Sequence, residues 1–337
     1  MGEAGAATVD GGGSVRGRVW RARAASLVQR QGALVALAVL FVFAAFRYAN
    51  FLTQENLLNV LRQNSMVGLV ALGMTFVILT GGIDLSVGSL LAVAGVVAAS
   101  LSGRGLLPAL LAGVAVAAAL GLVNGLVIAK ARIQPFIVTL AMMIAARGFA
   151  LAYTKEESVR VERTSAGFAE LGRGRVELGF VDLPYPVIVL LAAFALGWLV
   201  LTRTRFGRHV YALGDNEEAA RLMGLNVGRV TVGVYALSGA LAGLAGVMLT
   251  SRLGAGQPVA GIGWELDAIA AVVVGGTLLT GGQGGVGSTL VGVILLGLIF
   301  NIFNLEGQIS PWWQLVFRGV ILLAVVVVQN RLSKGKR

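Results

Sequence analysis

Long apolar stretches with almost no charge constrain this sequence more than any other feature. A helix needs about 20 apolar residues to cross the ~30 Å hydrocarbon core of a bilayer. Strands of a membrane barrel would instead alternate polar and apolar residues, so these continuous runs predict helices. We expect an all-α polytopic membrane protein with about ten transmembrane helices, several of them short or broken by glycine. The candidate segments are 27–46, 66–80, 87–101, 106–129, 135–153, 184–201, 230–250, 264–280, 287–303 and 312–329.

The composition agrees with this class. Apolar residues make up 57% of the chain and charged residues 13%, whereas soluble domains carry about 25% charge. The 48 glycines suit helices that approach closely inside a membrane. The absence of cysteine excludes disulfides and thiolate metal sites. The single histidine, His209, has no second ligand near it in the sequence, so we expect no metal site.

The basic residues predict the orientation. They cluster in the N-terminal tail, at 130–132, across 203–229 and at 331–337. Ten spans with an inside N-terminus place all four clusters in the cytoplasm, as the positive-inside rule requires. The net charge of +11 therefore reflects membrane topology, and we do not expect nucleic-acid binding.

The same pattern divides the chain. We expect a disordered cytoplasmic tail over 1–25, one transmembrane domain over 26–330, and a basic cytoplasmic tail over 331–337. The longest external loop covers 154–183, and the longest cytoplasmic loop covers 202–229.

A polar stretch inside that cytoplasmic loop, 205–224, contains the signals of a short helix. Asp215 predicts an N-cap, and Glu218 three residues later completes a capping box. Gly224 is placed to end the helix as its C′ residue. The predicted helix, about two turns over 216–223, is too short to be stable alone in water. It therefore requires a surface on which to dock.

The small residues Ala219 and Ala220 keep one face of this helix shallow, which suits insertion into a groove on another protein. The alternative is a capped helix in an ordinary loop of a membrane protein.

A partial internal repeat relates two parts of the chain. Leu-Thr-Gly-Gly at 79–82, followed by Val-Gly-Ser at 87–89, recurs at 279–282 and 286–288. In both copies a span ends, the backbone becomes rich in glycine, and a new helix begins. Repeats with helices broken at matching positions are common in transporters.

Catalytic motifs are missing from the sequence. It has no GxxxxGK[ST] nucleotide loop, HExxH or GxSxG, so ATP hydrolysis would need a partner. Carboxylates expected at membrane depth are Asp84, Glu265 and Asp267, and such groups are functional candidates by default. Asp84 fits two roles: capping the next helix together with Ser86, or contacting substrate. A proton relay would need a chain of such groups, which the sequence does not contain.

Uncharged polar residues within or beside the spans suit neutral polyhydroxylated solutes, which need donors and acceptors without net charge. Each of them could equally form a hydrogen bond between helices. Together with the carboxylate of Asp84 they form the candidate translocation pathway: Asn64, Thr80, Asp84, Ser86, Asn124, Thr280 and Asn301.

Five segments together resemble the permease subunits of bacterial ABC importers for monosaccharides, the ribose/xylose/autoinducer-2 type. They are GMTFVILTGGIDLSVGS at 73–89, the stretch 205–224, YALSG at 235–239, AGV at 245–247 and ELDAIAA at 265–271. The resemblance extends from about residue 50 to residue 328 and is most specific in GGIDLSVGS.

The resemblance implies a coupling helix that lies in a cleft of a cytoplasmic ATPase. The residues carried over are Asp215, Asn216, Glu217, Glu218, Ala219, Ala220 and Gly224. It also implies a second permease copy, identical or similar, and an extracytoplasmic sugar-binding protein. Candidates for docking that protein are Glu156, Glu157, Arg160, Arg252 and Glu265. ATP and Mg²⁺ would bind to the ATPase, with no cofactor on this chain. The setting would be the inner or plasma membrane of a bacterium, with both termini cytoplasmic.

Three alternatives stay open. A permease for branched-chain amino acids would need sites for an ammonium and a carboxylate. A secondary transporter would need an ion site or a proton relay. A structural or receptor-type membrane protein would leave the capped helix and the repeated Thr-Gly-Gly breaks unexplained. The sequence does not identify the sugar.

Overall fold

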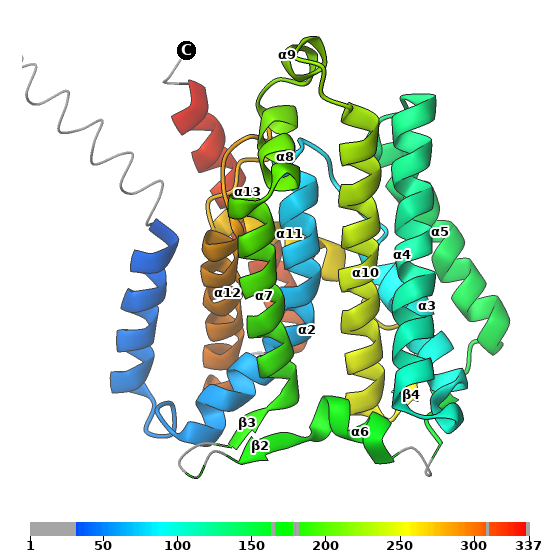
Figure 1. The fold of residues 1–337 in the computed structure, drawn as a ribbon. Helices are drawn as coiled ribbons and strands as arrows, with labels where there is room; N and C mark the ends of the chain where they lie inside the picture. Colours follow the sequence, from blue (N-terminus) through cyan, green and yellow to red (C-terminus); the bar gives the residue numbers. More distant parts are fainter. Residues whose placement is uncertain (1–31, 163–165, 178, 180–181, 308–309, 335–337) are drawn as a thin grey trace, which may run out of the picture.

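A bundle of long helices makes up most of the computed structural model, which describes residues 32–162, 166–177, 179, 182–307 and 310–334. Figure 1 shows the helices running between two ends of the molecule. The long elements are Gly32–Arg47, α2 (Gln54–Leu79), α3 (Val87–Ser100), α4 (Leu106–Ala131), α5 (Pro135–Thr154), α7 (Tyr185–Arg203), α10 (Val227–Leu253), α11 (Trp264–Val274), α12 (Val286–Glu306) and α13 (Pro311–Lys334).

Six of the described helices are long and apolar enough to cross a membrane: α2, α4, α5, α7, α10 and α12. The helix Gly32–Arg47 and α3 are apolar but shorter. The prediction of a helical, multi-pass membrane protein is thus confirmed, whereas the count of ten spans is not. The expected tails, 1–25 and 331–337, lie outside the described residues except for the last turn of α13.

Two predicted spans differ most from the helices in the structure. The helix expected at 66–80 begins at Gln54, where the Thr53 side chain accepts a hydrogen bond from the Asn56 amide. The first turns of this helix are polar, so its start could not be recognised from hydropathy. The span expected over 264–280 ends at Val274, after 11 residues. A glycine-rich loop, 275–285, follows it.

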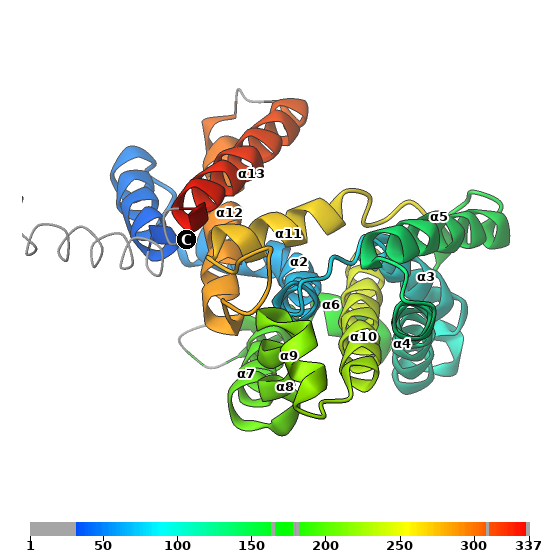
Figure 2. The ribbon, with the colours of Figure 1, turned by 90° about the horizontal axis from the view of Figure 1, so that it is seen from above.

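Helix α10 is central and packs on α2, α3 and α4, as the view from above shows (Figure 2). Glycines allow its close contact with α4. A β-carbon on Gly121 of α4 would overlap the Tyr235 carbonyl oxygen, and one on Gly239 of α10 would overlap that of Ala117. This is the packing by small residues expected inside a membrane.

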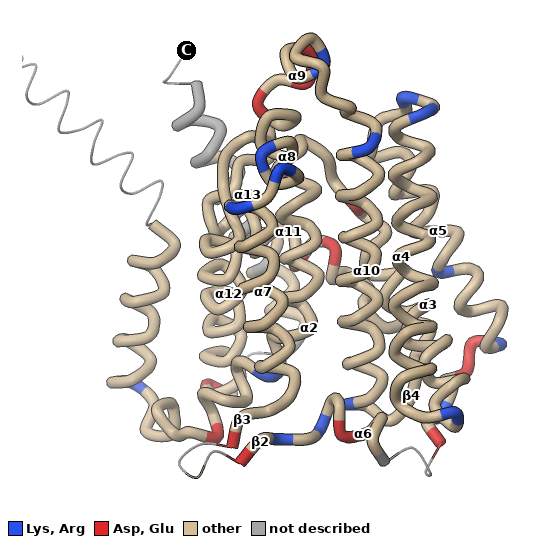
Figure 3. The backbone as a smooth tube through the Cα atoms, in the orientation of Figure 1, with Lys and Arg blue, Asp and Glu red and all other residues tan. Residues whose placement is uncertain are grey.

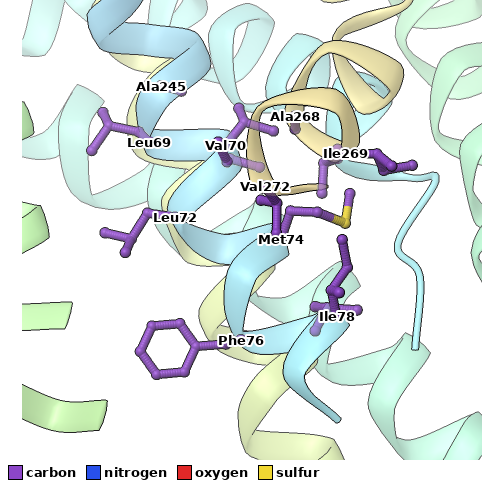
Figure 4. Packing of buried hydrophobic residues seen from close by; sticks show 14 of the residues in the cluster. Leu69, Val70, Leu72, Met74, Phe76, Ile78, Ala245, Ala268, Ile269 and Val272 are labelled. Carbon is purple, nitrogen blue, oxygen red and sulfur yellow. The ribbon is translucent and has the colours of Figure 1, made fainter. Parts of the chain in front are cut away.

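The second half of α2 forms the middle of the core, where every residue from Leu69 to Leu79 is buried. Figure 4 shows its apolar side chains packed together with residues of α11 and with Ala245 of α10. The α11 residues labelled there are Ala268, Ile269 and Val272, all buried. Because the second half of α2 is packed on all sides, its end gives the glycine-rich segment that follows a fixed starting point.

Short elements cap the two ends of the bundle. At one end lie α8 (Arg205–Asp215) and α9 (Glu217–Leu222). At the other end lie α6 and two small antiparallel sheets, with charged residues gathered at both ends (Figure 3). The elements of this second end are η1 (Ser102–Arg104), β1 (Val159–Arg160), α6 (Ala166–Arg173), β2 (Arg175–Glu177), β3 (Asp182–Pro184) and β4 (Ala255–Gly256).

The sheets tie distant segments together. Strand β1 pairs with β4, so that Val159 lies opposite Gly256, and β2 pairs with β3. The segment after α5 is thereby attached to the segment after α10, and the described parts of 154–183 have a defined structure.

Candidate coupling and transport site

The α8–α9 hairpin projects from one end of the bundle. Helix α8 begins after Thr204, whose hydroxyl accepts a hydrogen bond from the Gly207 amide. The Tyr211 hydroxyl donates to the carbonyl oxygen of Gly284 at 2.8 Å, and partial burial raises the pKa of this phenol. It therefore remains a donor at neutral pH and fastens α8 to the 275–285 loop.

The start of α9 differs from the prediction by one residue. Asn216 is the N-cap, and its side-chain oxygen accepts from the Ala219 amide at 2.9 Å. Asp215 is instead the last residue of α8. Because the third residue after the true cap is Ala219, Glu218 does not complete a capping box, and that part of the prediction is wrong.

The end of α9 agrees with the prediction. Gly224 has φ +80°, the left-handed conformation that glycine adopts without strain. Its amide donates to the Arg221 carbonyl, and the Leu225 amide donates to that of Ala220. These two bonds form a Schellman motif, which satisfies the last carbonyls of the helix.

Of the two small residues expected on the docking face of α9, Ala219 is half-buried and only Ala220 departs clearly from the prediction. Ala220 is fully buried against its own chain, so it does not present a shallow face to a partner. Leu222 and Met223 are instead 84% and 75% exposed. Sequence reasoning missed both, although two large apolar residues next to each other in a polar loop were a usable signal.

The two Leu-Thr-Gly-Gly motifs meet at the end of α8. The Gly282 amide donates to the Leu79 carbonyl oxygen at 3.0 Å. A β-carbon on Gly214 would overlap that same oxygen, and one on Gly281 would lie 2.9 Å from both the Gly214 oxygen and the Gly81 nitrogen. We call this contact of 79–82, 214–215 and 279–282 the glycine joint.

Asp84, in the break between α2 and α3, has hydrogen bonds at both carboxylate oxygens. Oδ1 accepts from the Ser86 amide at 3.0 Å and from the Ser86 hydroxyl at 2.6 Å. Oδ2 accepts from the Ser238 hydroxyl at 2.9 Å. The Asn124 side chain donates to the Ser86 hydroxyl at 2.9 Å. Since all four residues are 0–1% exposed, this arrangement favours the anchoring role of Asp84 over substrate contact.

The other pathway candidates lie elsewhere. Asn301 of α12 exchanges two hydrogen bonds with Asn56 of α2, and Asn64 donates to the Val60 carbonyl in its own helix. Thr80 and Thr280 belong to the glycine joint. The structure thus joins three of the seven candidates, Asp84, Ser86 and Asn124, in one hydrogen-bonded cluster.

The residues predicted to dock the sugar-binding protein lie in two different places. Glu156, Glu157 and Arg160 are exposed near β1, and Arg252 lies beside β4, at the end of the bundle opposite α9. Glu265 lies apart from them, at the first turn of α11, with its carboxylate against Gly88 of α3. The structure thus brings four of the five to one end.

Arg147 is a further candidate that the sequence reading did not single out. It lies in the apolar helix α5, where one guanidinium nitrogen donates to the carbonyl oxygens of Pro258 and Ala260 at 2.6 and 2.7 Å. It therefore holds the segment between β4 and α11. A lone arginine within an apolar span was the available signal.

The part of the chain that the structure describes contains no group of three or more His, Cys, Asp or Glu that could hold a metal ion. What it contains is a multi-pass helical bundle, two glycine-rich breaks in contact, and a capped hairpin at one end. Together, the helices, the paired breaks and the capped hairpin have the architecture of a membrane permease.

Comparison with known proteins gives the family. Residues 56–326 match the family described as branched-chain amino acid transport system / permease component, and the chain belongs to it. The ribose import permease protein RbsC of Escherichia coli K12 is 45% identical over 90% of this chain and 94% of that protein. RbsC of Bacillus subtilis is 44% identical over 91% and 94%. The L-arabinose transport system permease protein AraH of E. coli K12 is 40% identical over 95% and 94%. No solved structure matched.

Proposed function

We propose that this chain is the membrane-spanning subunit of an ATP-driven importer for a monosaccharide. A separate cytoplasmic ATPase binds ATP and Mg²⁺ and docks on α9. An extracytoplasmic sugar-binding protein docks at the opposite end, and a second permease copy completes the pathway. The assembly lies in the inner or plasma membrane of a bacterium.

The observation that carries this proposal is the exposed tip of α9. Helix α9 has only six residues, and Leu222 and the adjoining Met223 expose large apolar side chains to solvent. A helix this short is not stable by itself in water and needs a surface on which to pack. Exposed Leu222 and Met223 suit a hydrophobic pocket on a partner, because burial there removes their apolar surface from water.

The glycine joint supplies a route from the ATPase to the spans. A displacement of α9 moves α8, and the end of α8 contacts both glycine-rich breaks without side chains between them. In this mechanism ATP binding and hydrolysis move α9, and the two breaks shift together between inward-open and outward-open arrangements. The chain itself performs no hydrolysis.

The orientation follows from the same hairpin. The first described helix begins on the α9 side, and α13 ends on that side (Figure 1). If α9 faces the ATPase, both termini point into the cytoplasm and the β1–β4 end faces outward. The basic residues near α8 and α9 (Figure 3) support this orientation.

The relatives favour a monosaccharide over a branched-chain amino acid. The family description names amino acids, but the proteins 40–45% identical over most of this chain are named for ribose and L-arabinose.

The test is reconstitution of the permease with its ATPase in liposomes, with the sugar-binding protein outside. We expect uptake of radiolabelled ribose or L-arabinose that requires ATP and is not competed by leucine. Uptake that continues without ATP and collapses with an ionophore would instead indicate a secondary transporter.

A further inference from the structure

A cavity of about 480 Å³ lies between α9, the α4–α5 turn, α10 and the end of α2. Its volume is in the range of small-molecule sites, about 300–1,000 Å³. Three elements of the coupling mechanism contribute to its wall: the first glycine-rich break, the end of α8 and two residues of α9. A molecule bound there would contact the moving parts directly.

Polar side chains reach the cavity from three places besides α9. Thr80 follows α2, Arg132 and Gln134 lie in the turn after α4, and Tyr235 is on α10. The Tyr235 side chain is 1% exposed, and its hydroxyl has no hydrogen-bond partner in the described structure. That hydroxyl lies at Gly82, which also lines the cavity. A buried, unpartnered hydroxyl at a cavity wall is a group that a ligand could satisfy.

The charges of the cavity do not cancel. Glu217 and Arg221 of α9 form an ion pair at 2.6 Å and neutralise each other. Arg132 is exposed and forms no ion pair with any described residue. It also has φ +53°, an uncommon conformation for a residue other than glycine. One positive charge is therefore left for a ligand.

We propose that this cavity binds a small hydroxylated anion, of the class of a monosaccharide phosphate, and that the bound molecule restrains α9. Arg132 pairs with the phosphate, while Gln134, Thr80 and Tyr235 bind sugar hydroxyls. Because the ligand fills space against α9, it stabilises one position of the coupling helix and slows the transport cycle. The choice of a sugar phosphate rests on the proposed function, since it is what an imported monosaccharide becomes when phosphorylated on the α9 side.

The first experiment measures binding to the purified permease–ATPase complex by equilibrium dialysis, with ribose 5-phosphate, ribose and inorganic phosphate as separate probes. We expect ribose 5-phosphate to bind at least tenfold more tightly than either of the others. Equal binding of ribose would show a site for neutral sugar and overturn the charge argument. Equal binding of inorganic phosphate would show an adventitious anion site. Absence of binding at millimolar concentration would overturn the inference.

Variants separate a ligand site from a structural defect. Arg132→Gln should weaken ribose 5-phosphate binding about tenfold or more, whereas Lys130→Gln, an exposed residue outside the cavity with the same charge change, should not. Tyr235→Phe should weaken binding several-fold without lowering the melting temperature, because it removes a hydroxyl that has no partner. Unchanged binding in both cavity variants would contradict the proposal.

A second readout links the site to coupling. Ribose 5-phosphate should slow ATP hydrolysis by the complex several-fold, and Arg132→Gln should abolish this effect. Dialysis does not depend on transport, so its result is separate from the reconstitution test. Binding without sugar uptake would refute the proposed function alone, and uptake without binding would refute this inference alone.

Discussion

The amide of Gly282 donates a hydrogen bond to the carbonyl oxygen of Leu79, 203 positions earlier in the chain, at a distance of 3.0 Å. These residues occupy nonequivalent places in two copies of Leu-Thr-Gly-Gly, and Gly214 of α8 packs against the same carbonyl. The repeat is therefore a contact in three dimensions as well as a pattern in the sequence.

Gly214→Ala should break the glycine joint. A β-carbon there would overlap the Leu79 carbonyl oxygen, which belongs to the backbone and cannot rotate away. We expect a loss of about 1–3 kcal/mol of stability from overpacking, and ATP hydrolysis no longer coupled to uptake. Melting of the detergent-solubilised protein and transport in liposomes measure the two effects.

Gly148→Ala is the matched control, since a β-carbon there meets nothing within 4 Å. It lies inside α5, so alanine should be neutral or stabilising by up to about 1 kcal/mol. If Gly214→Ala behaved like this control, the joint would have no mechanical role.

Replacing both Leu222 and Met223 by serine should weaken ATPase binding. Both side chains are mostly exposed in the isolated chain, so the fold should be unaffected. Removing two apolar anchors from an interface should raise the dissociation constant by about 10- to 100-fold or more. Co-purification and titration with the ATPase provide the measurement. Leu253→Ser, an exposed leucine at the opposite end, should leave the affinity unchanged.

Asp84→Ala should destabilise the break between α2 and α3. The substitution leaves the Ser86 amide and the Ser86 and Ser238 hydroxyls without their acceptor in a buried site. We expect a loss of about 3–5 kcal/mol and a clear drop in melting temperature, with a smaller drop for Asp84→Asn. Wild-type melting combined with lost transport would indicate that Asp84 contacts substrate instead. The exposed Asp182 provides a control for loss of a carboxylate.

Arg147→Lys should loosen the segment between β4 and α11. Lysine keeps the charge but puts a compact, strongly hydrated ammonium in place of the guanidinium nitrogen that reaches both carbonyl oxygens. Because the chain has no cysteine, a single Val259→Cys substitution gives a unique label in this segment. Its reaction with a maleimide should become several-fold faster in Arg147→Lys and stay the same in the exposed control Arg104→Lys. An unchanged rate in both would show that Arg147 does not hold the segment.

The sequence was most informative where apolar runs end at glycine, proline or charge. The predicted bounds of α3, α4, α5 and α7 are within two residues of the structure, since the end of hydrophobicity and the end of the helix coincide there. The start of α2 was not predictable in this way. Its first turns are polar, and Asn56 finds its partner on α12, 245 positions away.

The sequence predicted where the short coupling helix lies in the chain, but not which of its side chains are exposed. Gly224 was assigned correctly because its role depends on backbone conformation alone. The burial of Ala220 could not be foreseen, because it depends on how α9 folds back against α8 and α10. The N-cap shifted from Asp215 to Asn216 for a similar reason: α8 continues one residue further than local signals indicated.

A contact made of main-chain atoms responds to mutation differently from one made of side chains. Substitutions at Gly81, Gly214 or Gly282 can break the glycine joint. These glycines have no side chain that a mutation could shorten or lengthen, so the contact cannot be weakened in small steps. Differences in transport rate between related permeases should therefore arise in the helices that surround the glycine joint, while the joint itself is either intact or lost.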